Sequence, residues 1–173
     1  VLDFYDPLPG ATIDVGGHDL GLAADLSAGL AKTVEVAPRT YFAGFVTPGG
    51  APATTRLGLL EPYQPGKSPV VLIHGLFSDP QSWADLINDV RAAPGFNERY
   101  QIWVFRYPTG QGFLQSASVL RRELQAAIDA LDPNEQDPAL RQAVLIGHSM
   151  GGLIAKLQAT YSEELVWSRL ANR

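Results

Sequence analysis

The sequence predicts a protein of the α/β class, in which helices cover both faces of a mostly parallel sheet in a three-layer sandwich. Three mostly apolar runs, at 70–73, 100–107 and 143–146, have the length of buried strands, and segments with apolar residues at helical spacing separate them. A strand that is buried on both faces tends to be apolar along its whole length. Helices that connect such strands make right-handed parallel crossovers. The alternation of strand and helix therefore predicts this architecture.

The helices expected between these strands have apolar stripes and recognisable ends. Asp79 and Pro80 supply a capping residue and a proline at the first helical position. The first stripe follows at positions i, i+3, i+4 and i+7, in Trp83, Leu86, Ile87 and Val90. A second stripe is formed by Ala117, Leu120, Leu124, Ile128 and Leu131. A third helix is expected at 151–160, so each strand is followed by a helix with one face to bury.

The first part of the chain is less regular. Residues 1–40 are expected to form an N-terminal extension, and residues 41–173 the main domain, which we expect to be an incomplete one. Leucines at helical spacing predict a short helix within 19–36: Leu22, Leu26 and Leu30. Two further strands are expected at 41–46 and 54–60, ahead of the first buried strand.

Composition excludes several classes of function. The chain has 173 residues, is 46% hydrophobic and 18% charged, and has a formal net charge of -5. An acidic chain lacks the basic face that nucleic-acid binding requires. No apolar run approaches the roughly 18 residues that a transmembrane helix needs. The absence of Cys excludes disulfides, a thiol nucleophile and a thiolate-bound metal. Because the chain begins at Val1, it does not reveal whether a targeting segment once preceded it.

One motif points to chemistry. Gly147-His148-Ser149-Met150-Gly151 follows a predicted buried strand and opens a predicted helix. This glycine-x-serine-x-glycine pattern holds a serine on a tight strand-to-helix turn, where glycines avoid collisions with the neighbouring backbone. The turn also places the Met150 N–H at a helix N-terminus, which favours negative charge. We therefore expect Ser149 to be a nucleophile.

A second motif, His74-Gly75-Leu76, follows the first buried strand. Acyl transfer places negative charge on a carbonyl oxygen, which two backbone N–H groups can stabilise by a few kcal/mol. One N–H is expected from Met150 and the other from Leu76, with Phe77 as the alternative if the loop is one residue longer. Gly75 would allow the backbone to approach the reacting group closely.

These segments resemble the α/β-hydrolase superfamily. The resemblance rests on VVLIHGLFSD (70–79), YQIWVFRYP (100–108) and AVLIGHSMGGL (143–153). Within the superfamily the chain is similar to bacterial lipases and carboxylesterases, and to GPI inositol-deacylase-like esterases. The resemblance implies a Ser149 nucleophile, oxyanion N–H groups from Leu76 and Met150, a small-molecule or lipid ester substrate, and no metal or organic cofactor. Such relatives are often exported or attached to the cell envelope.

The chain departs from the superfamily pattern after the serine. The acid and the histidine of the triad should follow the nucleophile in the sequence. The residues after Ser149 include Glu163 and Glu164 but no His. We therefore expect a fragment of a longer hydrolase, inactive or nearly so by itself, with further strands outside it. Its third strand would be an open sheet edge that favours self-association.

The three histidines are expected to be structural. His74 would brace the oxyanion loop, His148 would point away from the serine hydroxyl, and His18 would lie in a surface turn. Tyr107 and Phe113 follow the second strand, where an acyl chain or ordinary packing would suit them equally. Two other functions fit the same motifs: an acyltransferase on this fold, and a non-catalytic interaction domain that retained the scaffold.

Overall fold

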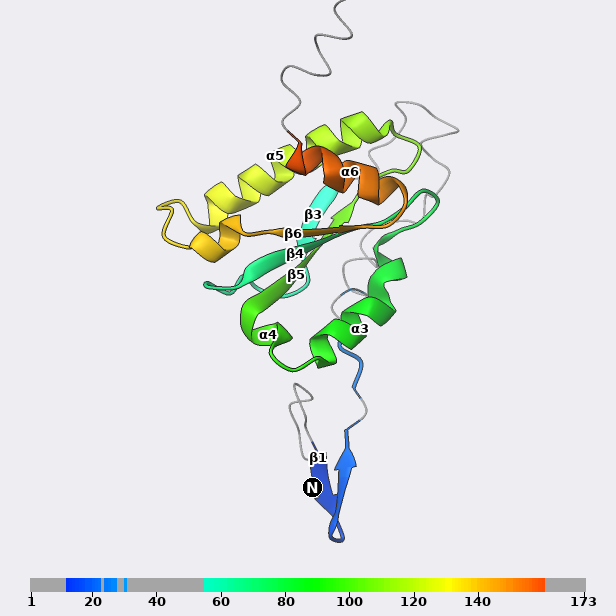
Figure 1. Ribbon diagram of the computed structural model, residues 1–173, viewed down its shortest axis with the longest axis vertical. Coiled ribbons are helices and arrows are strands. Elements are labelled where there is room, and N and C mark those ends of the chain that lie inside the picture. The colour runs from blue at the N-terminus through cyan, green and yellow to red at the C-terminus, as the bar shows by residue number, and fades with distance from the viewer. Residues whose placement is uncertain (1–11, 23, 28–29, 31–54, 161–173) are drawn as a thin grey trace, which may run out of the picture.

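The computed structural model describes residues 12–22, 24–27, 30 and 55–160, and Figure 1 shows its layers. Four strands form the main sheet in the order β3-β5-β4-β6. Their bounds are Arg56–Leu59 for β3, Ser68–Ile73 for β4, Tyr100–Arg106 for β5 and Val144–Gly147 for β6. β4 pairs in parallel with both β5 and β6, whereas β3 pairs with β5 in the antiparallel sense. The mostly parallel sheet confirms the predicted fold class.

Helices cover both faces of this sheet (Figure 1). The 3-10 turn η1 (Pro80–Trp83), α3 (Ala84–Ala92) and α4 (Phe96–Arg99) lie on one face. The other face carries α5 (Phe113–Leu131), the 3-10 turn η2 (Pro138–Arg141) and α6 (Met150–Ala159). Asp79 caps η1 by accepting a hydrogen bond from the Gln81 N–H at 2.8 Å, as its position before Pro80 predicted. The short helix α4, which the sequence did not predict, starts after Gly95 in the left-handed region at φ 79°.

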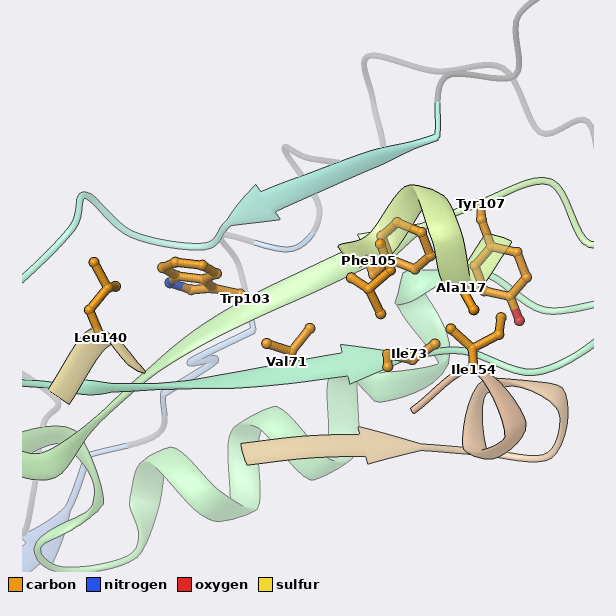
Figure 2. Close-up of a cluster of buried hydrophobic side chains, with 9 residues drawn as sticks. Val71, Ile73, Trp103, Phe105, Tyr107, Ala117, Leu140 and Ile154 are labelled. Carbon is orange, nitrogen blue, oxygen red and sulfur yellow. The ribbon is translucent and has the colours of Figure 1, made fainter. Parts of the chain in front are cut away.

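Successive side chains of β4 and β5 point to opposite faces of the sheet and so divide the core into two clusters. Val71 and Ile73 of β4 point to the α5 and α6 face, together with Trp103 and Phe105 of β5. Figure 2 shows this cluster closing against Ala117, Leu140 and Ile154. The intervening residues of both strands, such as Val70, pack toward Ile87 of α3. Because both faces are covered, β4 and β5 are buried almost throughout, which explains their continuous apolar sequences.

The N-terminal part differs from its prediction. Thr12–Val15 (β1) and His18–Gly21 (β2) form an antiparallel hairpin, so the expected helix within 19–36 is wrong over 19–21. Gly16 and Gly17 both have positive φ, 63° and 84°, which suits a two-residue hairpin turn. The Gly-Gly turn is thus the stronger local signal over 18–21, and the predicted leucine stripe, which starts at Leu22, begins only after the hairpin.

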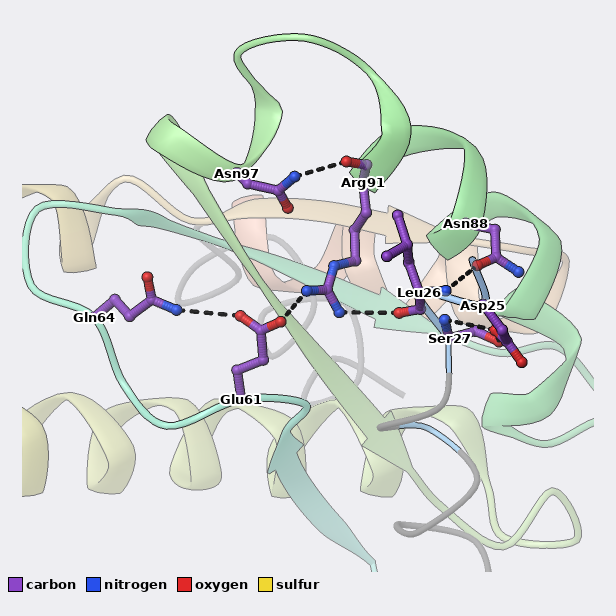
Figure 3. Close-up of polar contacts among 8 residues, drawn as sticks. All are labelled: Asp25, Leu26, Ser27, Glu61, Gln64, Asn88, Arg91 and Asn97. Atoms are coloured by element: carbon purple, nitrogen blue, oxygen red, sulfur yellow. Dashed lines mark hydrogen bonds and ion pairs between the residues drawn. The ribbon is translucent and has the colours of Figure 1, made fainter. Parts of the chain in front are cut away.

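The segment that follows the hairpin is tied to the main domain through α3. The Leu26 N–H donates to Asn88 Oδ1 at 2.6 Å, and Arg91 donates to the Leu26 carbonyl at 2.9 Å. Arg91 also forms an ion pair with Glu61 (Figure 3). Leu30 is buried in the core on the same face. The expected strand at 41–46 and the domain boundary at residue 40 lie outside the described residues.

β6 is an edge strand of the sheet formed by the described residues. Val144 at its start is 42% exposed, and an apolar groove of about 170 Å³ lies between β6 and the helices α3 and α4. Exposed strand edges and apolar surface favour association. Self-association of the chain, measurable by sedimentation, therefore stays a prediction. Within the part of the chain that the structure describes, no helix combines the length and apolarity needed to cross a membrane.

Candidate active site

The carboxyl ends of β4 and β6 lie side by side, with Ile73 paired to Gly147. At this edge β6 turns directly into α6, and Ser149 is the residue before the helix begins. Ser149 has φ 53° and ψ -121°, a backbone conformation that costs a non-glycine residue about 1–3 kcal/mol. Its side chain is exposed. The turn therefore holds a serine hydroxyl at the sheet edge in strained geometry.

Two glycines make this turn sterically possible. A Cβ on Gly147 would lie 2.3 Å from the Gly151 carbonyl oxygen. A Cβ on Gly151 would lie 2.1 Å from the Ile73 oxygen and 2.6 Å from the His74 oxygen. These distances are far below van der Waals contact, so the turn packs backbone against backbone. The sequence motif thus reflects a packing requirement.

The loop after β4 lies against the serine turn. The His148 N–H donates to the Ile73 oxygen at 3.1 Å. A Cβ on Gly75 would lie 2.8 Å from His148 Nδ1 and 3.2 Å from the Ser149 Cβ. Residues 74–76 and the serine turn, which are far apart in the sequence, are therefore packed together at one edge of the sheet.

The backbone N–H groups of Met150 and Leu76 are the two donors that the sequence predicts for an oxyanion. Met150 is the first residue of α6, and N–H groups in the first turn of a helix have no acceptor within the helix. Leu76 directly follows Gly75 and its side chain is 42% exposed. The helix dipole adds positive potential at the Met150 end. An oxyanion site formed by these two N–H groups stays a prediction.

His74 is fully enclosed. It is 1% exposed, and its ring stacks on Tyr107 with the ring centroids 4.4 Å apart. Its Nδ1 lies 3.1 Å from the Gly75 oxygen, and its Nε2 lies 3.4 Å from the Tyr107 backbone nitrogen. Burial lowers the pKa of His74, and the nearby Arg106 adds to this effect, whereas the Gly75 hydrogen bond and Asp79 oppose it. Burial therefore favours the neutral form of the ring, which is already hydrogen-bonded within the loop.

The other histidines are not hydrogen-bonded to the serine either. His148 is exposed, with its ring beside Gly75. His18 starts β2 and is exposed, in a hairpin that Figure 1 shows at the opposite end of the molecule from α6. Among the described residues no side chain forms a hydrogen bond with the Ser149 hydroxyl. Glu163 and Glu164 lie outside them. In this arrangement, therefore, none of the chain's histidines is placed to activate the serine as a base.

The sequence did not reveal the role of Tyr107. It left open whether this side chain lines an acyl-chain site or packs in the wall, and the structure shows it 3% exposed. Its hydroxyl donates to the His74 carbonyl at 2.6 Å. Only the pairing of β4 with β5 brings these residues together, so no local pattern could have shown the contact. Phe113, by contrast, is an exposed residue at the start of α5.

The buried His74 predicts that the protein loses stability in mild acid. Because the folded-state pKa lies below the value of 6.5 for an unfolded histidine, the unfolded chain binds more protons as the pH falls below about 6.5. The free energy of unfolding should then fall by up to about 1.4 kcal/mol per pH unit. Melting curves from pH 7.5 to 5 would measure this. His74→Asn should flatten the dependence and His148→Asn should not; equal slopes in both variants would contradict the assignment.

A mostly parallel sheet with a serine held at its carboxyl edge, in a glycine-flanked turn between strand and helix, defines a protein of the α/β class. A model of the alpha/beta hydrolase family matches residues 70–168, which is more than half of the chain. The chain therefore belongs to the alpha/beta hydrolase family, most of whose members are hydrolytic enzymes. No curated protein and no solved structure matches it significantly. No group of three or more metal-binding side chains occurs among the described residues.

Proposed function

We propose that Ser149 is the nucleophile of a carboxylic ester hydrolase. The observation that carries this proposal is the exposed serine in a strained turn, packed against the Gly75 loop. Strained backbone persists only where the surrounding structure enforces it, and it concentrates at functional sites. A scaffold that served only for binding would have no need to hold a serine in this conformation.

In the proposed reaction, Ser149 Oγ attacks the ester carbonyl carbon and gives up its proton to a general base. The carbonyl oxygen becomes an oxyanion that accepts hydrogen bonds from the Leu76 and Met150 N–H groups. Each such donor contributes about 3 kcal/mol to lowering the barrier. Collapse of the tetrahedral intermediate expels the alcohol, which takes up the proton, and leaves an acyl group on Ser149. Water then hydrolyses this ester by the same steps in reverse order.

None of the chain's three histidines is placed to act as the general base. His74 is enclosed in the loop, His148 lies beside Gly75, and His18 is in the distant hairpin. An unassisted serine hydroxyl is a poor nucleophile near neutral pH. We therefore propose that a further histidine and an acid complete the site, and that the 173 residues alone hydrolyse esters very slowly.

Exposed apolar side chains on the same edge of the sheet support a lipidic acyl group. Large apolar side chains are exposed on the segments that leave this edge of the sheet: Leu76, Phe77, Phe113, Leu114 and Leu153. Such exposed apolar residues mark surfaces that bind apolar partners. The narrower resemblance to lipases and GPI inositol-deacylase-like esterases agrees with this substrate class. Hydrolysis that is faster for octanoyl than for acetyl esters would support it.

Covalent labelling tests the proposal directly. A fluorophosphonate should label the natural protein that carries these residues, and peptide mass spectrometry should place the adduct on Ser149. Ser149→Ala should abolish labelling, whereas Ser118→Ala, at an exposed serine on α5, should leave it intact. Absence of labelling would favour a non-catalytic domain. Transfer of the acyl group to an added alcohol in preference to water would identify an acyltransferase instead.

A further inference from the structure

We infer that Tyr107 is a positioning residue, which acts through His74 to aim the Leu76 N–H at the oxyanion. This inference rests on the proposed function of Ser149. Tyr107 is the first residue after β5, and His74 is the first residue after the neighbouring parallel strand β4. The two side chains therefore meet beneath the loop that carries Leu76.

Three consecutive carbonyl oxygens of this loop each accept a hydrogen bond from a different donor. The His148 N–H donates to the Ile73 oxygen at 3.1 Å. The Tyr107 hydroxyl donates to the His74 oxygen at 2.6 Å. The His74 ring donates from Nδ1 to the Gly75 oxygen at 3.1 Å. The serine turn, the end of β5 and the loop itself thus hold the three peptide groups in place.

The last of these bonds determines the direction of the Leu76 N–H. The Gly75 carbonyl and the Leu76 N–H belong to one planar trans peptide group, in which they point in opposite directions. A carbonyl that is held on one side therefore directs the N–H to the other side. For this to occur, His74 must carry its proton on Nδ1, because only a protonated ring nitrogen donates.

Tyr107 selects this tautomer. Its backbone N–H points at His74 Nε2, 3.4 Å away, and a donor there requires a bare Nε2 with its lone pair. The Tyr107 hydroxyl and the stacked rings, tilted by 12°, keep the imidazole in the required plane. Both side chains are almost fully buried, so water does not compete for these bonds. Phenylalanine at this position would keep the backbone donor and the ring but lose the bond to the His74 carbonyl.

Ester hydrolysis by Tyr107→Phe in the natural protein is the first test. We expect kcat to fall by about 10- to 100-fold with KM nearly unchanged, because small displacements of a transition-state donor affect the chemical step. Tyr63→Phe is the matched control, since it removes a hydroxyl that binds Asp137 in the segment before η2. A general loss of stability would affect both variants, whereas only Tyr107→Phe should lower kcat.

The tautomer itself is measurable by ¹⁵N NMR of the His74 ring. The wild-type protein should show a protonated Nδ1 and a bare Nε2, and Tyr107→Phe should shift the Leu76 amide resonance.

If Tyr107→Phe does not fold, His74→Asn replaces it in the test, because an asparagine amide retains a donor at the δ position. It should keep more activity than His74→Gln, whose amide lies one carbon farther from the backbone.

The outcomes separate this inference from the proposed function. A wild-type protein that hydrolyses esters and labels at Ser149, together with unchanged kcat and Leu76 resonance in Tyr107→Phe, would overturn the inference alone. A wild-type Nε2–H tautomer would overturn it as well. A wild-type protein that is neither labelled nor active would overturn the proposed function, whatever the tautomer of His74.

Discussion

Gly151→Ala is expected to lower the free energy of unfolding by more than about 3 kcal/mol or to prevent folding, because it forces overpacking between two backbone segments. The added Cβ would lie 2.1 Å from the Ile73 carbonyl oxygen, and neither partner is a flexible side chain. Relief would require α6 to separate from the end of β4. The yield of folded protein and its melting temperature measure the effect.

The neighbouring Gly152 is the matched control. A Cβ there would meet nothing closer than the Gly147 oxygen at 3.4 Å, which is ordinary contact. Since alanine is favoured over glycine inside a helix by about 0.5–1 kcal/mol, Gly152→Ala should be neutral or slightly stabilising. If Gly151→Ala melted at the same temperature as Gly152→Ala, the close packing of α6 on β4 would be wrong.

Ser149→Gly is expected to abolish ester hydrolysis while it stabilises the fold. Removal of the nucleophile from a complete site should lower kcat by at least about 10⁴-fold. Glycine adopts positive φ without a steric penalty, so relief of the strain at φ 53° should raise the free energy of unfolding by about 1 kcal/mol.

Ser149→Ala distinguishes the two effects, because it removes the hydroxyl but retains the Cβ that causes the strain. It should lose activity equally and show a melting temperature close to that of the natural protein. Esterase assays and thermal melts of both variants would decide the matter. A Ser149→Gly protein that is less stable than Ser149→Ala would show that the turn is not strained.

Much of this architecture could be predicted from local patterns. Continuous apolar runs indicated the strands β4 and β6, of which β4 is buried and β6 is a partly exposed edge strand, and Asp79 before Pro80 indicated where η1 begins. These signals are strong because burial on both faces and helix capping act on adjacent residues. The hairpin β1–β2 was missed, because residues 12–21 contain no continuous apolar run and Gly16-Gly17 was interpreted only as a turn.

The sequence by itself determined the class of fold, the serine at a strand-to-helix turn and the glycines around it, because each of these depends on residues that are neighbours along the chain. Only the tertiary structure decided what surrounds that serine. Parallel pairing places Gly75 against Ser149 and Tyr107 beneath His74, across separations that no local pattern spans. The fold also encloses His74, and His18 lies apart from it in the β1–β2 hairpin. The reason is physical: backbone conformation follows from local sterics, whereas the protonation and orientation of a side chain depend on whatever the fold packs around it.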